Sequence, residues 1–221
     1  MGKRNVWIER FWQMLLWLVL GMCFGGGRPA VAQEFVPVDP ERQQQLLEEI
    51  TRVSAGIETL ECSFVQRKTM AVLAETVEAA GKMYYRKADR MRWEYLQPEA
   101  YYFVINAGKS LMKKGGVIDR GGGARIFGEI SKMILTCISG QQLVDEQKFT
   151  PAYTQAGDIF KITLVPKNRR MLQMMSALVM EFDMREHDIR AVEMWQGEDV
   201  TRIEFKDKQV NGRLDEALFR V

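Results

Sequence analysis

The chain has 221 residues, of which 31 are Lys or Arg, 29 are Asp or Glu, one is His and three are Cys. This charge balance gives no reason to expect a nucleic acid or an anionic membrane surface as a partner. The single histidine, His187, has no cluster of cysteines or carboxylates around it at the spacing of metal ligands, so we expect no metal site.

The first 32 residues have the pattern of a cleaved secretory signal peptide. A basic segment ending at Arg10 precedes an apolar run over 11–24, and Ala30-Val31-Ala32 offers the small residues that signal peptidases require. The apolar run of about 14 residues is shorter than the roughly 20 that a membrane-spanning helix needs. We therefore expect export and cleavage after Ala32, which leaves a mature chain of nearly neutral charge.

Residues 33–221 are expected to form a single domain, because their length is typical of one domain and no linker or repeat divides them. This part contains two cysteines, Cys62 and Cys137. In an oxidising compartment the two could form a disulfide, and the alternative is a pair of buried free thiols.

The mature chain opens with a predicted helix followed by strands. Asp39-Pro40 is typical of an N-cap with proline at the first helical position, and Gly56 stands near the expected end of that helix. Alternation of apolar and polar residues then predicts a strand over 60–64, and a second strand is expected over 75–85.

The segment 81–112 predicts three or four consecutive strands separated by polar turns. Met91, Trp93 and Tyr95 alternate with charged residues, so the apolar set lies on one face of its strand. Tyr101 and Phe103 continue the pattern one strand later. A sheet with this much aromatic and methionine surface on one side needs something to cover that side.

After residue 120 the apolar period changes to that of a helix with one wide apolar stripe over 126–138. The stripe consists of Ile126, Phe127, Ile130, Met133, Ile134, Cys137 and Ile138. Strands are expected again over 159–165, 177–184, 189–195 and 200–208, and a helical turn over 214–218.

Successive strands joined by short turns predict an antiparallel sheet, and the helices must cover its apolar face. About ten strands rarely remain flat. The expected fold class is therefore α+β and mainly β, with a curled antiparallel sheet that forms a half-open barrel covered on its concave face by helices.

No catalytic motif is apparent. The Gly-x-Ser-x-Gly pattern of a nucleophile elbow is absent. Gly108-Lys109-Ser110 resembles the end of a phosphate-binding loop, but Phe103 stands where that loop needs a glycine, so we predict a turn. We therefore expect neither an enzyme nor a cofactor.

Short motifs follow one another along the mature chain in an informative order. They are Phe64-x-Gln66, Gly81, Arg92-Trp93-Glu94-Tyr95 with Pro98 soon after, Ile105–Leu111, Leu164–Lys167 and the closing Leu214–Phe219. Together they resemble the outer-membrane lipoprotein carrier (LolA) family over essentially the whole mature chain.

The resemblance implies a periplasmic half-barrel with a helical lid, which we expect to be a monomer. Such a protein would take acylated lipoproteins from an inner-membrane ABC-type releasing complex and shield their acyl chains in a hydrophobic cavity. It would pass them to an outer-membrane receptor without hydrolysing ATP itself. Two alternatives stay open: a LolA-like lipid-binding sensor module that acts on a signalling partner, and a carrier of another acyl lipid.

Methionine is flexible and polarisable and adapts to ligands of varied shape, and the mature chain is rich in it. We expect a lipid-binding cavity between the strands and the helix over 126–138. Its expected lining is Met83, Tyr85, Met91, Trp93, Tyr95, Phe103, Ile126, Ile130, Met133 and Ile134.

One position departs from the family pattern. Members commonly carry Arg-Pro shortly after the strand that Gly81 opens, and that arginine is thought to latch the lid through hydrogen bonds to its backbone. Here Lys87 and Ala88 occupy the two positions. Lysine keeps the charge but lacks the planar fork of donors. We expect Lys87 to act as the latch, and the alternatives are Arg92 and its neighbours Arg86 and Arg90.

Overall fold

The computed structural model describes residues 34–73, 75–119, 128, 131–132, 134–135, 138 and 143–221. Its strands are β1 (Val36–Pro37), β2 (Thr59–Met70), β3 (Glu75–Arg86), β4 (Arg90–Gln97), β5 (Tyr101–Asn106), β6 (Lys109–Lys114), β7 (Val117–Asp119), β8 (Phe149–Ala156), β9 (Ile159–Pro166), β10 (Ala177–Asp183), β11 (Asp188–Gln196) and β12 (Asp199–Val210). The helical elements with defined bounds are α2 (Pro40–Ala55), α4 (Arg169–Leu172) and the short 3₁₀ turns η1 (Ala71–Leu73) and η2 (Glu216–Phe219).

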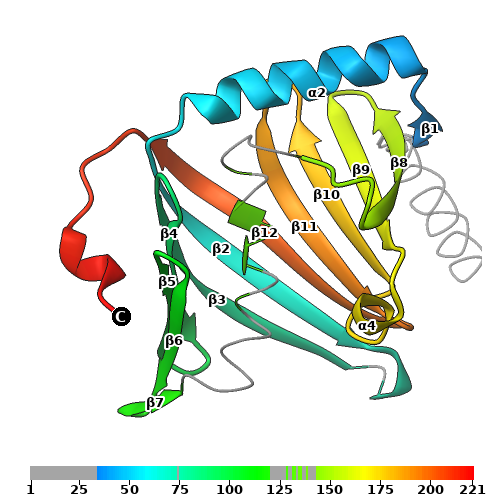
Figure 1. The fold of residues 1–221 in the computed structure, drawn as a ribbon. Coiled ribbons are helices and arrows are strands. Elements are labelled where there is room, and N and C mark those ends of the chain that lie inside the picture. Colours follow the sequence, from blue (N-terminus) through cyan, green and yellow to red (C-terminus); the bar gives the residue numbers. More distant parts are fainter. Residues whose placement is uncertain are drawn as a thin grey trace, which may run out of the picture. The chain divides into compact units, whose positions relative to one another are not determined.

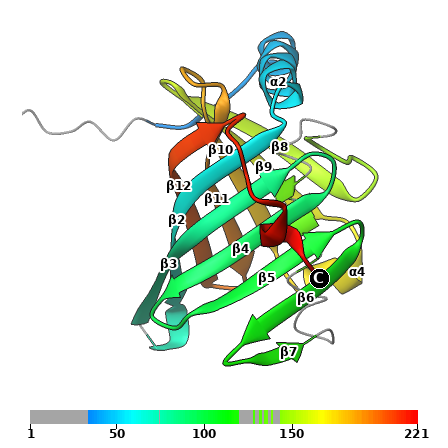
Figure 2. The ribbon, with the colours of Figure 1, turned by 90° about the vertical axis from the view of Figure 1, so that its left-hand side faces the viewer.

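Within the described residues, all twelve strands form one antiparallel sheet in the order β1-β8-β9-β10-β11-β12-β2-β3-β4-β5-β6-β7 (Figures 1 and 2). The edge strands β1 and β7 do not pair with each other, so the sheet is open rather than closed into a barrel. This confirms the predicted fold class.

The sequence did not predict β1 or β8. β1 has only two residues, and β8 contains Pro151 among polar residues, which hides its alternation. Because β8 pairs with β1 at only two positions, it lies close to the edge of the sheet, where proline is tolerated. The sheet therefore has twelve strands instead of the expected ten or so.

Helix α2 forms where the capping residues predicted it. The Asp39 side chain accepts a hydrogen bond of 3.0 Å from the backbone N–H of Arg42, and Pro40 follows directly. Leu46 and Ile50 are fully buried on the face that contacts the sheet, and α2 runs along its upper rim (Figure 1). The helix ends at Gly56, as expected.

The described residues of the second predicted helix, from Gly128 to Ile138, are helical. Ile134, Leu135 and Ile138 are buried in the same core cluster as Leu46 of α2 and the apolar face of the sheet. Both helices thus cover one face of the sheet. The remaining stripe positions, Ile126, Phe127, Ile130, Met133 and Cys137, lie outside the described residues.

Gly81 is required by a close approach between β3 and β4. The pairing shifts by one residue between Ala80 and Gly81, which marks a β-bulge. A Cβ at Gly81 would lie 2.0 Å from the carbonyl oxygen of Glu94 and 2.9 Å from the Phe64 ring. Neither the sheet backbone nor a packed core ring has room to move away.

Replacing Gly81 by Ala should lower the free energy of unfolding by about 3 kcal/mol or more, because the new methyl group collides with backbone. Urea denaturation followed by tryptophan fluorescence would measure the change. Gly212→Ala is the matched control, since nothing lies within 4 Å of its added Cβ. Equal stability of the two variants would contradict this account of the bulge.

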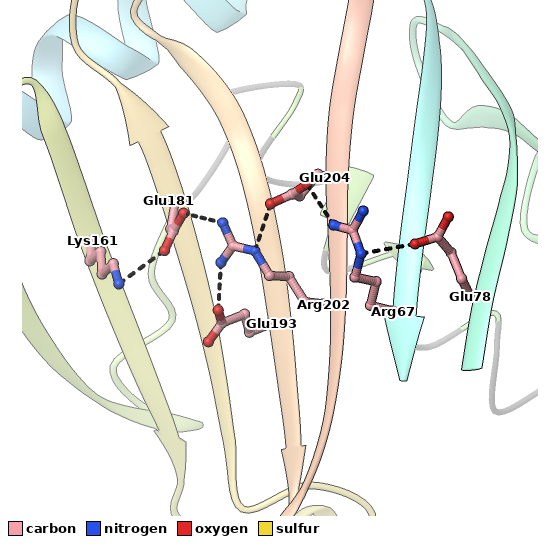
Figure 3. Close-up of polar contacts among 7 residues, drawn as sticks. All are labelled: Arg67, Glu78, Lys161, Glu181, Glu193, Arg202 and Glu204. Carbon is pink, nitrogen blue, oxygen red and sulfur yellow. Dashed lines mark hydrogen bonds and ion pairs between the residues drawn. The ribbon is translucent and has the colours of Figure 1, made fainter. Parts of the chain in front are cut away.

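A chain of ion pairs crosses the outer face of the sheet (Figure 3). Arg202 donates to Glu181 at 2.8 Å, Glu193 at 2.5 Å and Glu204 at 3.0 Å. Lys161 approaches Glu181 at 2.9 Å. Burial alone would raise the pKa of Glu181, but the hydrogen bonds from Arg202 and Lys161 outweigh it and the pKa is lowered. The network ties together β9 to β12 on the side away from the helices.

Arg202→Met should lower the free energy of unfolding at pH 7 by about 2–4 kcal/mol, because Glu181 is left buried with one partner fewer. The lowered pKa means that the stabilisation is present above the ordinary value of 4.5 and is lost as pH falls through the folded-state pKa. The difference between variant and wild type should therefore shrink in urea denaturation at acidic pH.

Arg67→Met provides the control, because Arg67 pairs with the more exposed Glu78 and with Glu204. It should cost less than about 1 kcal/mol. An Arg202→Met effect that is equally small, or independent of pH, would contradict the role assigned to Glu181.

Candidate functional site

The apolar face of β3, β4 and β5 brings together the strand residues predicted to line a cavity. The pairing places Met83 opposite Trp93 and Trp93 opposite Phe103, and it places Tyr85 opposite Met91. Alternate residues of a strand share a face, so these side chains form two adjacent rows across the sheet. All six predicted strand positions are at most 2% exposed: Met83, Tyr85, Met91, Trp93, Tyr95 and Phe103.

Aromatic contacts hold this face in place. The Phe64 ring meets Trp93 and Tyr95 edge-on, with ring centroids 5.0 Å apart in each case. Trp93 Nε1 donates to Met91 Sδ at 2.9 Å. Tyr95 donates its hydroxyl to Gln66 Oε1 at 2.8 Å and stacks on Tyr101. Edge-on and offset rings are the favourable arrangements for aromatic pairs, so the face is well packed.

The helices pack directly onto these rows. Ile134, the described member of the predicted helical lining, is buried in the same core cluster. Ligand sites usually enclose about 300–1,000 Å³. A hollow of about 180 Å³ lies elsewhere, around Tyr101, Tyr102 and Lys113. The described side chains of the apolar face are buried in one core cluster with residues of both helices.

A partly buried ion pair marks one end of this core. The β2–β12 pairing shifts between Lys206 and Gln209, so Asp207 and Lys208 both lie opposite Cys62. Asp207 has a positive φ of 52°. This bulge turns Lys208 towards Asp188, and Lys208 Nζ donates to both carboxylate oxygens at 2.5 Å. Burial raises the pKa of Asp188 despite that contact.

Cys62 is a buried free thiol next to this ion pair. Burial raises the pKa of the Cys62 thiol to about 12, which makes the thiolate scarce at neutral pH. Cys137, its proposed disulfide partner, lies outside the described residues.

Lys87 follows β3 and contacts the end of α2. Its Nζ donates to the backbone carbonyl of Ala55, the last residue of α2, at 3.0 Å and to Glu58 Oε1 at 2.8 Å. The carbonyl groups of a final helical turn lack hydrogen-bond donors within the helix, so Lys87 supplies a donor for one of them. The geometry is the one expected of a latch residue, whose function remains a proposal.

Arg92 lies on the opposite face of β4 from Met91 and Trp93. It donates to Glu94 at 3.0 Å, stacks over the Tyr102 ring at 3.8 Å and reaches the carbonyl of Leu218. Its described contacts are therefore with the sheet and the C-terminal segment rather than with α2, because even-numbered residues of β4 point outwards.

The neighbouring arginines also hold the C-terminal segment. Arg86 pairs with Glu216 and donates to the Leu214 carbonyl at 2.5 Å, and Arg90 donates to Glu216 at 2.7 Å. Phe219 is buried beneath them. The alternative latch residues thus bind η2 and its flanks on the outer face of the sheet.

Sequence reasoning missed the pair Lys208–Asp188. The strands expected over 177–184 and 189–195 leave 185–188 as the turn between them, and Lys208 stands at the end of the strand expected over 200–208. A bulge depends on which residues pair across two strands, so the sequence of one strand alone does not predict it. His187 does lie in the predicted turn, where it contacts Glu49 of α2 at 3.4 Å.

The residues that the structure describes contain no group of three or more His, Cys, Asp or Glu arranged to hold a metal ion. In the same part of the chain, each helix is too short or too polar to cross a membrane.

The described fold is an open antiparallel sheet with helices over one apolar face. A family model described as outer membrane lipoprotein carrier protein LolA matches residues 55–221, which is well over half of the chain. The chain therefore belongs to the LolA family. The family's description is that of a carrier rather than an enzyme.

The chain is also similar to several solved structures at low identity. A LolA superfamily protein from Nitrosomonas europaea is 8% identical, with a TM-score of 0.46 over 80% of this chain and 97% of that one. The lipoprotein LppX from Mycobacterium tuberculosis is 12% identical, with a TM-score of 0.39 over 78% and 99%. The MucA/MucB complex of Pseudomonas aeruginosa gives 10% identity and a TM-score of 0.48 over 81% and 61%. No curated protein matches the chain.

Proposed function

We propose that this protein is a periplasmic carrier that shields the acyl chains of lipoproteins and ferries them from the inner to the outer membrane. The observation that supports it most directly is the match of the chain to the lipoprotein-carrier family, combined with a continuous apolar face covered by helices. The expected signal peptide over 1–32 would deliver residues 33–221 to the periplasm.

The proposed cycle exchanges one apolar cover for another. In this structure, Leu46, Ile50 and Ile134 are buried in the same core cluster as Met91 and Trp93. An acyl chain that replaced them would gain about 0.8 kcal/mol for each CH₂ removed from water. Because the helices lose similar contacts, loading and unloading can stay close to balance, as delivery requires.

The partners follow from this cycle. An inner-membrane ABC-type releasing complex would supply the work of lifting the acyl chains from the bilayer, and an outer-membrane receptor would accept them. The carrier itself would need neither a cofactor nor a catalytic site, and a monomer is sufficient.

Purification of the protein from its native periplasm, followed by native mass spectrometry, should reveal a co-purifying acylated lipoprotein. Depletion in vivo should leave lipoproteins in the inner membrane, as measured by membrane fractionation. Co-purification of a free acyl lipid would instead support a carrier of another lipid. Normal lipoprotein sorting after depletion, in a cell with no second carrier gene, would overturn the proposal.

Lys87 provides a test of how the empty form is held closed. If its contact with the Ala55 carbonyl stabilises the closed form, Lys87→Leu should bind a fluorescent acyl lipid about three- to tenfold more tightly and release it more slowly. Lys87→Arg should bind more weakly, since a guanidinium can bond two carbonyls at once. Fluorescence titration and stopped-flow transfer to acceptor vesicles would measure both effects.

Lys82→Leu is the matched control, because Lys82 lies on β3, the strand that Lys87 follows, and pairs with Glu61 on the surface. Its lipid affinity should equal that of the wild type. If Lys87→Leu behaves like this control, Lys87 is not the latch.

A further inference from the structure

The Tyr85 hydroxyl is an unsatisfied polar group in the core. The side chain is fully buried, and within the described part of the chain Tyr85 Oη has no hydrogen-bond partner. Buried polar groups in native proteins nearly always have partners, so each exception needs an explanation. Phenylalanine would fill the same space without leaving a hydroxyl unpaired.

Tyr95 shows what the same fold does with an ordinary buried tyrosine. Tyr95 lies on the same face, one strand away and towards the other end of the core, and its hydroxyl is bonded to Gln66 at 2.8 Å. The sheet can therefore supply a partner for a buried phenol. The lack of one at Tyr85 points to a partner that comes from outside the described chain.

Tyr85 also lies at the polar end of the core. It pairs with Leu60 on β2, and Leu60 pairs with Val210 on β12. Leu60 lines a hollow of about 20 Å³ together with Ile138, Asp188 and Lys208. The neighbouring row includes Met83, Trp93 and Phe103, which belong to the hydrophobic core cluster.

Helix α2, which covers part of the core, ends beside the same small hollow. Ser54 and Ile57, at the end of α2, line the small hollow, and Lys87, two residues after Tyr85, bonds the Ala55 carbonyl. Displacement of the end of α2 would thus uncover the Tyr85 hydroxyl near Glu58, which pairs with Lys87, with an apolar surface extending away from it. This arrangement matches a ligand with one polar end and an apolar tail.

We propose that Tyr85 Oη donates a hydrogen bond to the carbonyl oxygen of the ester or amide that joins an acyl chain to its lipid or lipoprotein. The inference rests on the proposed carrier function and adds to it a polar contact and a direction. The carbonyl end lies near Tyr85 and the Lys87–Glu58 pair, and the hydrocarbon extends over Trp93 and Phe103.

Two fluorescent probes can isolate this contact: a pyrenyl alkane, and the methyl ester of the pyrenyl fatty acid with the same chain length. The wild type should bind the ester about five- to tenfold more tightly than the alkane. Tyr85→Phe should abolish that preference while leaving the affinity for the alkane unchanged. Its Tm should stay equal or rise by about 2–4 °C, because the empty protein no longer buries an unpaired hydroxyl.

Tyr84→Phe is the matched control, since Tyr84 is the adjacent residue on the same strand and packs on the outer face against Phe219. It should keep the ester preference. A preference that survives in Tyr85→Phe would overturn the inference, and so would a fall in Tm, which would reveal a structural partner for the hydroxyl in the empty protein.

The experiment distinguishes a failure of the carrier function from a failure of the role proposed for Tyr85. If the wild type binds neither probe, the carrier function itself is wrong. If the wild type and Tyr85→Phe bind both probes with the same affinities, the carrier function stands and only the role of Tyr85 is refuted.

Discussion

The structure depends on one constraint, which is that a single wide sheet must keep one apolar face out of water. That face runs across neighbouring strands from β8 to β5 in the order of the sheet, and its side chains belong to one core cluster. The sheet has no second sheet to pack against within the described residues, so the helices supply the cover. Exposure of this apolar face to water would be unfavourable. The position of the helices therefore decides whether a ligand can reach the face.

The cover and the proposed cargo use the same chemistry. Leu46, Ile50 and Ile134 are aliphatic, as an acyl chain is, and they contact a face rich in methionine and aromatic rings. Such a face does not distinguish strongly between a leucine side chain and a stretch of hydrocarbon. Under the proposed carrier function, selectivity would come from polar groups such as Lys87, Lys208 and the buried Tyr85 hydroxyl.

Local sequence patterns were enough to predict which strand residues share the apolar face. The alternation around Met91 and Trp93 specifies a strand and its buried side together, and the Asp39-Pro40 cap specifies the start of α2. The two bulges were not predictable, because a bulge is a property of paired strands. One of them makes Gly81 indispensable, and the other turns Lys208 inwards. The outward direction of Arg92 follows from alternation, but its partner, the segment around Leu218, is far away in sequence and no local pattern links the two.

The two unjoined edges of the sheet have a consequence for the volume it can enclose. In a closed barrel, the number of strands and their stagger fix the radius, so the interior cannot widen without breaking strand pairs. β1 and β7 are not joined to each other, and this geometric condition does not apply between them. Small changes in twist, summed from strand to strand, can move the edges apart while every ladder of hydrogen bonds stays intact. The volume on the concave side can therefore change, which would suit the proposed carrier if its cargo differs in the number and length of acyl chains.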